Sequence, residues 1–300
     1  MDESWECIIV GAGPAGLSAA LYMARFRRRV LVVHDGRSRA LRIPETHNVP
    51  GFPDGVGGAV LVERMAGHAR RYGAQLREAE VTAVRHDDAF VLETADGDRL
   101  AAQALVLATG LHLNEPPLPH AAHEAAIRAG VLRYCPICDG LEHAGQRIAV
   151  LGCDSSGAAE ALFLRQYSDD VTLLPMDMPE LGDRELRELA DAGVVVESRP
   201  VARLLPRADR FEVQLEGAAG TLSFGVVYPA LGTRQRTELA AQLGVPLDGA
   251  GAVDAHAPLG TAVAGLYCAG DIVDGLDQIS VAMGHGAVAA TRAHNWLRER

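Results

Sequence analysis

A pair of cysteines separated by two residues is the stretch of this chain best suited to chemistry. Two cysteines at this spacing close a small disulfide ring, and one thiol of such a pair usually has a lowered pKa. Thiol–disulfide exchange also needs a group that gives or takes a proton, and Asp139 directly follows the second cysteine. We therefore predict a redox-active disulfide with a neighbouring acid in the run Cys135-Pro136-Ile137-Cys138-Asp139-Gly140.

The same cysteine spacing is also typical of half a zinc site. A structural zinc site needs four ligands, which usually come as two Cys or His pairs at similar spacing. His143 could add one ligand, but no fourth suggests itself, because the remaining cysteines are far apart in the sequence. We therefore predict redox chemistry and no metal. The remaining cysteines lie in or beside apolar strands, and we expect them to be inert packing residues; they are Cys7, Cys153 and Cys268.

The composition of the chain excludes several classes of function. Its 300 residues are enough for two domains with sizeable cores. The formal net charge of −11 argues against nucleic acid or an anionic membrane as a partner. The chain has no lysine, which excludes a Schiff-base lysine and a Walker-A phosphate loop. No apolar run approaches the roughly 18 residues of a membrane span, and the acidic start does not fit a secretory signal, so we expect a cytoplasmic protein.

The N-terminal part of the chain has the order strand, glycine-rich turn, helix, strand that is typical of dinucleotide binding. Gly11 permits the tight turn, Gly13 lets a pyrophosphate approach the backbone, and Gly16 lets the helix pack on the strand. Pro14 is tolerated in the first helical turn, so the helix N-terminus stays free to face phosphates. Asp35, at the end of the second strand, is placed to accept hydrogen bonds from a ribose and disfavours a 2′-phosphate. We therefore expect FAD or NAD as the ligand, and not NADP.

A second unit of the same kind begins at Gly152, after the apolar strand 147–151. Asp154 stands where the second glycine of the turn should be, and its carboxylate would repel a phosphate. No arginine lies between Arg165 and Arg184, so a 2′-phosphate would meet no cation there. We interpret this unit as a domain that keeps the fold without a nicotinamide nucleotide. The alternative is an NADPH site that uses backbone contacts.

The C-terminal part of the chain contains a third informative stretch. A short strand ends in Gly270-Asp271, and Asp271 can hold the ribityl or pyrophosphate region of a flavin nucleotide. We expect the next segment, 278–295, to be a helix that is interrupted at Gly284-His285-Gly286 and whose N-terminus can face a flavin carbonyl. His285 is a candidate base, although it could also be an ordinary helix histidine. Earlier in the chain we expect a loop at 40–58 and a helix at 63–72.

The order of these motifs resembles that of the low-molecular-weight thioredoxin reductases. The similarity spans nearly the whole chain, and a cysteine pair inside the second nucleotide domain is specific to that group. The motifs that carry it are Gly11–Gly16, Asn48–Pro53, Ala108–Gly110, Cys135–Gly140 and Ala269–Asp271. The predicted fold class is α/β, with two Rossmann-like, three-layer ββα domains, the second inserted in the first. The FAD-binding domain would comprise residues 1–114 and 230–300, and residues 115–229 would form a module that resembles an NAD(P)H domain and carries the redox pair.

The resemblance also implies roles for individual residues. Cys138 would face the flavin, Cys135 would attack the partner disulfide, and Asp139 would be the general acid. The inserted domain would rotate about hinges near 115 and 229, and the protein would be a homodimer. FAD would be held by residues 11–16, the loop 34–42, Asn48 and residues 271–279. The cofactor-binding residues expected on these grounds are Gly11, Gly13, Pro14, Ala15, Gly16, Asp35, Gly36, Arg42, Asn48, Thr109, Gly110, Gly270, Asp271, Gln278 and Ile279.

The chain departs from that group at the NADPH site, because the glycine-rich turn and the His-Arg-Arg run of the reductases are missing. In this it resembles pyridine-nucleotide-independent relatives, either ferredoxin-linked flavin thioredoxin reductases or dithiol oxidases that pass electrons to oxygen. The oxidases usually carry His after the second cysteine, whereas this chain has Asp139, as the reductases do.

We predict a thioredoxin reductase-like, FAD-dependent thiol/disulfide oxidoreductase that works without NADPH. Its partner would be a thioredoxin-like protein or a small dithiol, and ferredoxin or O₂ would be the other electron partner. One alternative is an ordinary NADPH-dependent thioredoxin-disulfide reductase. Another is a non-catalytic FAD-binding partner or sensor, and the presence of both cysteines and Asp139 weighs against it.

Overall fold

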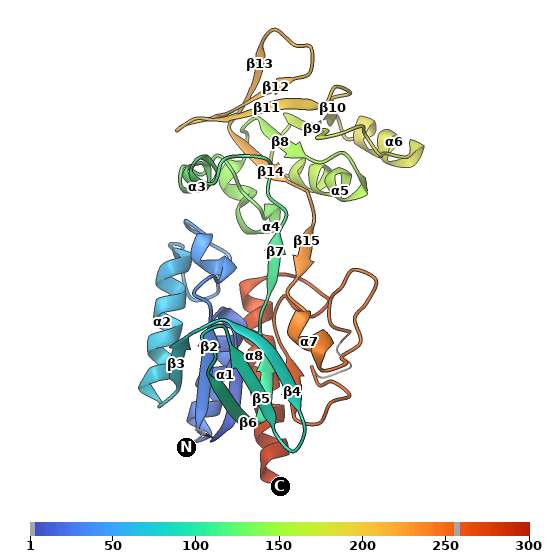
Figure 1. The fold of residues 1–300 in the computed structure, drawn as a ribbon. Coiled ribbons are helices and arrows are strands. Elements are labelled where there is room, and N and C mark those ends of the chain that lie inside the picture. The colour runs from blue at the N-terminus through green and yellow to red at the C-terminus, as the bar shows by residue number, and fades with distance from the viewer. Residues whose placement is uncertain (1–3, 255–258) are drawn as a thin grey trace. The chain divides into compact units, whose positions relative to one another are not determined.

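The computed structural model describes residues 4–254 and 259–300, and the protein divides into two compact units. The first unit comprises Met1–Glu45, Val49–His112 and Arg234–Arg300, and the second comprises Thr46–Asn48 and Leu113–Thr233. Each unit is built on a parallel sheet with helices, as Figure 1 shows. The predicted α/β fold with two Rossmann-like domains is confirmed.

The sheet of the first unit combines parallel and antiparallel pairing. In the part of the chain that the structure describes, this sheet has seven strands: six pair in the order β3-β2-β1-β6-β5-β4, and the seventh, β16, pairs with β6. The pairs of β3 with β2, β2 with β1, β1 with β6 and β16 with β6 are parallel, whereas β4 and β5 form an antiparallel ribbon. The strands are β1 (Ser4–Val10), β2 (Val30–His34), β3 (Gln75–Glu78), β4 (Val81–His86), β5 (Phe90–Thr94), β6 (Arg99–Leu107) and β16 (Leu266–Cys268).

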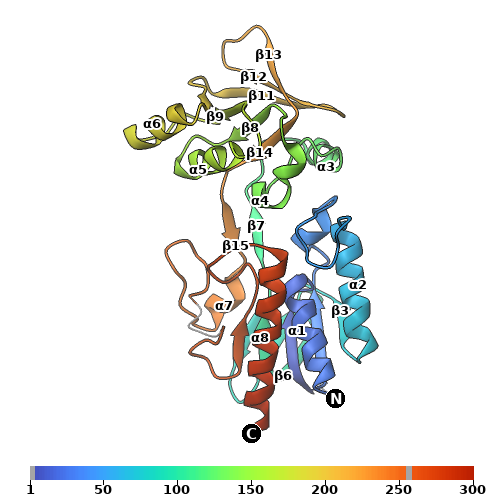
Figure 2. The ribbon, with the colours of Figure 1, turned by 180° about the vertical axis from the view of Figure 1, so that it is seen from behind.

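Helices cover one face of this sheet and the β4–β5 ribbon covers the other. The helices on the first face are α1 (Pro14–Arg25), α2 (Gly58–Arg71) and α8 (Ile279–Arg298), with the 3₁₀ helix η1 (Arg39–Arg42), whereas the short helix α7 (Glu238–Gln242) packs on the side of the ribbon. Along β1, Cys7 and Ile9 pack in the core that α1 and α8 share, while Ile8 and Val10 pack in the core with β4, β5 and α7. Strands with both faces buried have continuous apolar sequences, which is why 7–10 reads as one apolar run. The helices lie in front in Figure 2, and β4 and β5 lie in front in Figure 1.

Helix α8 is continuous, so the predicted interruption at Gly284-His285-Gly286 is wrong. The glycine serves close packing: a Cβ on Gly286 would lie 2.1 Å from the carbonyl oxygen of Ala15 in α1. Without a side chain at this position, the two helices can approach until their backbones touch, as small residues allow. A glycine in a helix costs roughly 1 kcal/mol relative to alanine, and this contact offsets that cost.

Helix α2 begins at Gly58, within the segment predicted as a loop. A Cβ on Gly58 would lie 1.7 Å from the carbonyl oxygen of Ala40 in η1. The glycine at the start of the helix therefore lets η1 pack directly on it. Sequence alone favoured a loop, because the glycines of this segment are also typical of turns.

The second unit repeats the layered arrangement around a smaller parallel sheet. Its strands pair in the order β10-β9-β8-β14, and a separate antiparallel sheet has the order β11-β12-β13. The strands are β8 (Ile148–Leu151), β9 (Val171–Leu174), β10 (Val195–Val196), β11 (Val201–Pro206), β12 (Phe211–Leu215), β13 (Thr221–Phe224) and β14 (Val226–Pro229). The helices are α3 (His120–Arg128), α4 (Pro136–Asp139), α5 (Ser155–Leu164) and α6 (Asp183–Asp191), with the 3₁₀ helix η2 (Leu141–His143).

Each face of the β8 sheet has its own core. Ile148 and Val150 pack against α5, while Ala149 and Leu151 pack toward β12 and β13. The chain enters and leaves this unit through two short strands that pair with each other, β7 (Leu111–Leu113) and β15 (Thr233–Gln235). Among the described residues, no helix is long and apolar enough to cross a membrane.

Candidate active site and nucleotide pockets

Cys135 and Cys138 form a disulfide at the start of α4, with their Cα atoms 5.2 Å apart. Pro136 occupies the first helical turn, where its fixed φ suits a helix and its missing N–H costs nothing. The backbone N–H of Cys138 donates to the carbonyl oxygen of Cys135 over 2.9 Å, which closes the turn. The sequence therefore holds the two sulfurs in one compact turn, as the predicted redox pair requires.

Asp139, the last residue of α4, is buried and held by one hydrogen bond and one ion pair. The hydroxyl of Tyr228 donates to its Oδ1 over 2.7 Å, and Nε of Arg133 forms an ion pair with its Oδ2 at 2.6 Å. Burial raises the pKa of Asp139 above its usual value, while Arg133 and Tyr228 act in the opposite direction. Neither partner was identified from the sequence: Tyr228 lies on β14, far along the chain, and Arg133, although only six residues before Asp139, belongs to no motif that links it to the carboxylate.

The three remaining cysteines are buried and free, as predicted. Burial raises the pKa of Cys7 and of Cys268 to about 12, and that of Cys153 to about 11. A thiol with such a pKa is a poor nucleophile at neutral pH, because only the thiolate reacts. Over residues 4–254 and 259–300, no group of three or more His, Cys, Asp or Glu side chains is arranged to hold a metal ion.

The first glycine-rich turn joins β1 to α1 and depends on two of its glycines for its shape. Gly11 has a φ of +112°, and a Cβ there would lie 2.2 Å from the carbonyl oxygen of Ala108. A Cβ on Gly16 would lie 1.9 Å from the carbonyl oxygen of Gly11. Gly13 is the N-cap of α1 and gives it no side-chain hydrogen bond. The first amides of α1 are therefore left for a ligand, which is the usual anion site at a helix N-terminus.

A pocket in the first unit opens around this turn and the ends of β2, β6 and β16. Of the expected cofactor-binding residues, Gly16, Arg42 and Asn48 are not part of its lining. Gly16 instead serves the packing of α1 on the turn. The lining contains the other twelve, which are Gly11, Gly13, Pro14, Ala15, Asp35, Gly36, Thr109, Gly110, Gly270, Asp271, Gln278 and Ile279.

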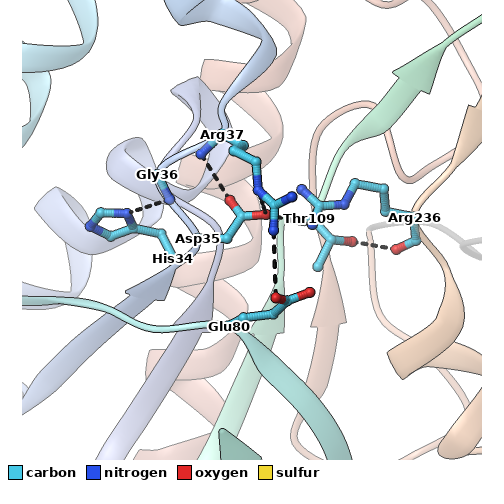
Figure 3. A network of polar contacts seen from close by, with 7 residues as sticks. All are labelled: His34, Asp35, Gly36, Arg37, Glu80, Thr109 and Arg236. Carbon is cyan, nitrogen blue, oxygen red and sulfur yellow. Dashed lines mark hydrogen bonds and ion pairs between the residues drawn. The ribbon is translucent and has the colours of Figure 1, made fainter. Parts of the chain in front are cut away.

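Asp35 follows β2 and is paired with an arginine that sequence reasoning missed (Figure 3). Its Oδ2 is 2.6 Å from Nη2 of Arg236, and its Oδ1 accepts from the backbone N–H of Arg37 over 2.9 Å. Burial acts to raise the pKa of Asp35, but these two partners outweigh it, so the pKa is below its usual value. The carboxylate is therefore ionised and fixed at the pocket wall.

Arg236 is itself positioned by the backbone near the pocket. Its carbonyl oxygen accepts from the hydroxyl of Thr109 over 2.6 Å, and its backbone N–H donates to the carbonyl oxygen of Gly110. The arginine lies 201 residues from Asp35 in the chain. No local pattern links two residues so far apart, so only the fold reveals the pair.

A second pocket shares Gly11, His34, Asp35, Thr109 and Arg236 with the first. It runs along the chain from Ala79 to Thr82 and also meets His112 and Glu238. Burial, together with Arg236 and Arg234, lowers the pKa of His112. Because the pyrophosphate is expected at the glycine turn and the ribose at Asp35, an adenine would lie in this second pocket.

Asp271 lies on the opposite side of the glycine turn, after β16. Its Oδ2 is 3.0 Å from Nη2 of Arg39, whose guanidinium also reaches the carbonyl oxygen of Asp277. Burial raises the pKa of Asp271, and the charges of Arg39 and His285 lower it. His285 itself does not line the first pocket, and within the described residues its buried Nδ1 has no hydrogen-bond partner.

In the second strand–turn–helix unit, groups of the protein itself occupy the turn before the helix. Asp154 is the N-cap of α5, and its Oδ1 accepts from the backbone N–H of Gly157 over 2.8 Å. The segment after β9 folds back over the turn, so that the N–H of Glu180 donates to the carbonyl oxygen of Cys153 over 2.7 Å. Asp154 and burial together raise the pKa of Glu160 in α5 to about 7, with burial the larger cause.

The first pocket fits a flavin adenine dinucleotide on structural grounds. The open N-terminus of α1 can receive the pyrophosphate, and Gly13 and Gly270 line the pocket with backbone alone. Asp35 and Asp271 present carboxylates on the two sides of the turn for the two sugar portions of the cofactor. The turn at Asp154 offers a carboxylate where a phosphate would need a donor, and it does not fit a dinucleotide in the same way.

The chain matches the family described as pyridine nucleotide-disulphide oxidoreductase over residues 5–286. It is 32% identical to the bifunctional thioredoxin reductase/thioredoxin of Mycobacterium leprae, over 98% of this chain and 66% of that longer protein. It is 31% identical to the thioredoxin reductase of Streptomyces coelicolor, over 99% of this chain and 95% of that one. The crystal structure of HlmI is similar with a TM-score of 0.90 and 29% identity, and the match covers 100% of this chain and 94% of HlmI.

Proposed function

The chain belongs to the pyridine nucleotide-disulphide oxidoreductase family and is an FAD-dependent disulfide oxidoreductase of the thioredoxin reductase type, and from this premise we propose that it works without NADPH. Electrons pass between FAD and a dithiol or disulfide substrate through Cys135 and Cys138. The other electron partner is ferredoxin or O₂. The protein acts in the cytoplasm as a homodimer.

FAD is held by the first unit. The N-terminus of α1 binds the pyrophosphate, Asp35 accepts from the adenosine ribose, and Asp271 accepts from the ribityl chain or the pyrophosphate region. The lining of the first pocket supports these assignments. Arg236 joins them, because it holds Asp35 at the pocket wall. Bound there, FAD supplies a two-electron donor and acceptor for the cysteine pair.

The second unit carries the thiol chemistry. Cys135 attacks the partner's disulfide and Cys138 exchanges electrons with the flavin, while Asp139 handles the proton. Ile137, between the two cysteines, and Leu141, shortly after them, have exposed apolar side chains, which suits contact with a thioredoxin-like protein or a small dithiol. The disulfide at the start of α4 supports these roles. His285, with a buried and unpartnered Nδ1 among the described residues, remains a candidate base close to Asp271.

One observation carries the proposal that NADPH is not the donor. In the second unit, the Asp154 carboxylate accepts the Gly157 N–H that a pyrophosphate would use in a dinucleotide site. The Glu180 contact also brings the segment after β9 back onto the turn. Each lost charge-assisted contact to a phosphate weakens binding by roughly 1.5–3 kcal/mol, so the loss of two or more lowers affinity by several orders of magnitude.

Anaerobic stopped-flow mixing of the purified flavoprotein with NADPH, NADH, dithiothreitol or reduced ferredoxin tests this proposal. We expect the dithiol to bleach the visible flavin absorbance readily and the nicotinamide nucleotides to bleach it slowly or not at all. Reduced ferredoxin should bleach it if ferredoxin is the donor, and rapid reoxidation by air should follow dithiol reduction if O₂ is the acceptor. Bleaching by micromolar NADPH within a second would contradict the proposal.

A second candidate is an ordinary NADPH-dependent thioredoxin-disulfide reductase. The 31% identity to the Streptomyces coelicolor thioredoxin reductase over nearly the whole of both chains favours it. A third candidate, a non-catalytic FAD-binding partner or sensor, predicts that dithiols leave the flavin absorbance unchanged. The same stopped-flow experiment therefore separates all three.

A further inference from the structure

The carboxylate of Asp139 is surrounded by groups that favour its ionised form. Its Oδ1 accepts a hydrogen bond from the Tyr228 hydroxyl over 2.7 Å, and its Oδ2 forms an ion pair with Nε of Arg133 at 2.6 Å. A neutral carboxylic acid would lose the charge attraction of Arg133 and would hold the Tyr228 hydroxyl less strongly. The two contacts therefore stabilise the anion and not the acid.

The elements packed around this carboxylate contribute few other charges. His143 of η2 lies close enough to lower the pKa of Asp139, and its ring meets that of Tyr228 edge to face. Glu142, also in η2, acts on Tyr228. Burial is the largest influence and raises the pKa of Asp139 toward the working range of a proton-transfer group. The Arg133 guanidinium and the Tyr228 hydroxyl lower the pKa of Asp139 and so limit how far burial raises it.

Tyr228 contacts Asp139 from a fully buried position on the central sheet of the second unit. Its side chain is fully buried on β14, and burial and the neighbouring Asp139 raise the pKa of its hydroxyl, which therefore remains a donor. A fully buried tyrosine hydroxyl needs a partner, since an unpaired one costs roughly 1–3 kcal/mol. Asp139 is that partner, so the strand and the cysteine turn are joined through one hydrogen bond.

We propose that Arg133 and Tyr228 are positioning residues that hold Asp139 as an anion, so that in this chain Asp139 takes a proton from a dithiol substrate. This inference rests on the proposed function, in which dithiols reduce the flavin through the cysteine pair. It assigns the carboxylate the role of base in dithiol oxidation, whereas the resemblance to thioredoxin reductases implies a general acid. Arg133 and Tyr228 act through Asp139 and need not touch the substrate.

The chemistry balances as a thiol–disulfide exchange. One substrate thiolate, its proton already lost to solvent, attacks the sulfur of Cys135, forms a mixed disulfide and releases Cys138 as a thiolate. Asp139 then removes the proton from the second substrate thiol. That sulfur attacks the first substrate sulfur, closes the substrate disulfide and releases Cys135 as a thiolate. The dithiol is oxidised by two electrons and the cysteine pair is reduced by the same two.

The test compares the pH dependence of anaerobic flavin bleaching by dithiothreitol in the wild type and in Tyr228→Phe. The variant keeps the buried ring and loses only the donor to Asp139. Without that donor the anion is less stable, so the acidic limb of the profile should move up by about one pH unit. Arg133→Gln should move the same limb by about one to two units, and Arg133→Lys, which keeps the charge, should restore part of the shift.

Tyr167→Phe is the matched control, because it removes a tyrosine hydroxyl from the same unit and leaves the contacts of Asp139 intact. Its profile should superimpose on that of the wild type. A carboxyl ¹³C NMR titration, assigned with Asp139→Asn, gives a readout that does not depend on turnover. The Asp139 resonance should titrate at higher pH in Tyr228→Phe than in the wild type.

The outcomes distinguish this inference from the proposed function. If dithiothreitol fails to bleach the wild-type flavin at any pH, the proposed function fails, while the NMR titration still reports on Arg133 and Tyr228. If the wild type is bleached but the Tyr228→Phe profile coincides with it, or if only its alkaline limb moves, the role of base is overturned. A loss of thermal stability with unchanged profiles and an unchanged NMR titration would show a purely structural role. Should Tyr228→Phe fail to fold, the two Arg133 variants decide the question alone.

Discussion

Gly13 and Asp154 occupy the same position in the two strand–turn–helix units, directly before the helix. The rest of the turn is alike in both. Gly11 and Gly152 have φ angles of +112° and +117°. A Cβ on the last glycine of either turn, Gly16 or Gly157, would lie 1.9 Å from the carbonyl oxygen of the first glycine. The first and last glycines are therefore required by the path of the chain, whether or not a ligand binds.

The second position of the turn is the one that reports on a ligand. Gly13 leaves the N-terminus of α1 without a side-chain cap, whereas Asp154 caps α5 with its own carboxylate. The second unit thus keeps the glycines that the fold needs and fills the place where a phosphate would bind. In such a glycine pattern, the first and last glycines therefore indicate the fold, and the middle position indicates whether a phosphate can bind. The following predictions test this contrast.

Gly13→Asp, which places the residue of the second turn in the first, should have the largest effect. The new carboxylate would cap α1 and repel the pyrophosphate, and FAD affinity should fall by at least ~10²-fold. The protein should purify largely without flavin, as the ratio of flavin to protein absorbance would report. A Cβ at Gly13 would meet only the Ser38 hydroxyl, at 3.2 Å, so the fold should persist.

Gly13→Ala is the control for this substitution, because it adds the Cβ without the charge. It should retain much more flavin than Gly13→Asp. If Gly13→Asp keeps its full flavin content, the pyrophosphate does not bind at this turn. Equal losses in the two variants would point to the Cβ, and not the carboxylate, as the cause.

Asp139→Asn tests whether nucleotide binding and thiol chemistry are divided between the units. The variant should bind FAD like the wild type, because the first pocket lies wholly in the first unit. Dithiol turnover should fall by about 10²-fold, the scale of a lost proton-transfer group. Steady-state oxidation of dithiothreitol and the flavin content of the purified variant measure the two effects. Loss of flavin from Asp139→Asn would argue against the division.

Arg236→Gln probes the ion pair with Asp35 in the first pocket. Without the guanidinium, Asp35 loses the partner that fixes it toward the ribose, and we expect FAD to bind about 10-fold more weakly. Titration of the apoprotein with FAD measures this. Arg37→Gln is the control: the Arg37 side chain is 68% exposed, and an exposed ion pair contributes little. An equal effect of the two variants would show that Arg236 has no special role.

The contrast between the turns could be read from the sequence, because the glycines, the two acids and the cysteine pair are local patterns. The distant partners of Asp35 and Asp139 could not be read in this way. Arg236 is 201 residues from Asp35, and Tyr228 is 89 residues from Asp139. Such contacts depend on which strands become neighbours, and periodicity and spacing do not encode that.

The interruption that we predicted in α8 was wrong for a similar reason: the contact that explains its glycines is far away in the sequence. Two glycines around His285 predict a break when only the helix itself is considered. Gly286 instead packs against the backbone of Ala15 on α1, which a single-sequence pattern cannot reveal. The same argument applies to Gly58 and Ala40 at the start of α2. Glycine thus marks a turn or a close helix contact, and the fold decides between them.

Asp154→Ala tests the other half of the contrast and should have the smallest effect. Removing the cap leaves the Gly157 N–H unpaired, which should cost about 1 kcal/mol of stability and lower the Tm by roughly 3 °C. Asp154→Ser keeps a side-chain acceptor at the cap and should stay close to the wild type. Thermal unfolding followed by circular dichroism compares the three proteins.

The same variant also shows whether Asp154 alone closes the second turn. We expect NADPH still to bleach the flavin of Asp154→Ala slowly, because the Glu180 contact with Cys153 remains and no arginine lies between Arg165 and Arg184. Fast bleaching by NADPH would mean that one carboxylate separates this unit from a working nicotinamide site. An unchanged Tm would instead mean that the cap adds nothing to stability, and the Asp154 carboxylate would then act only by excluding the phosphate.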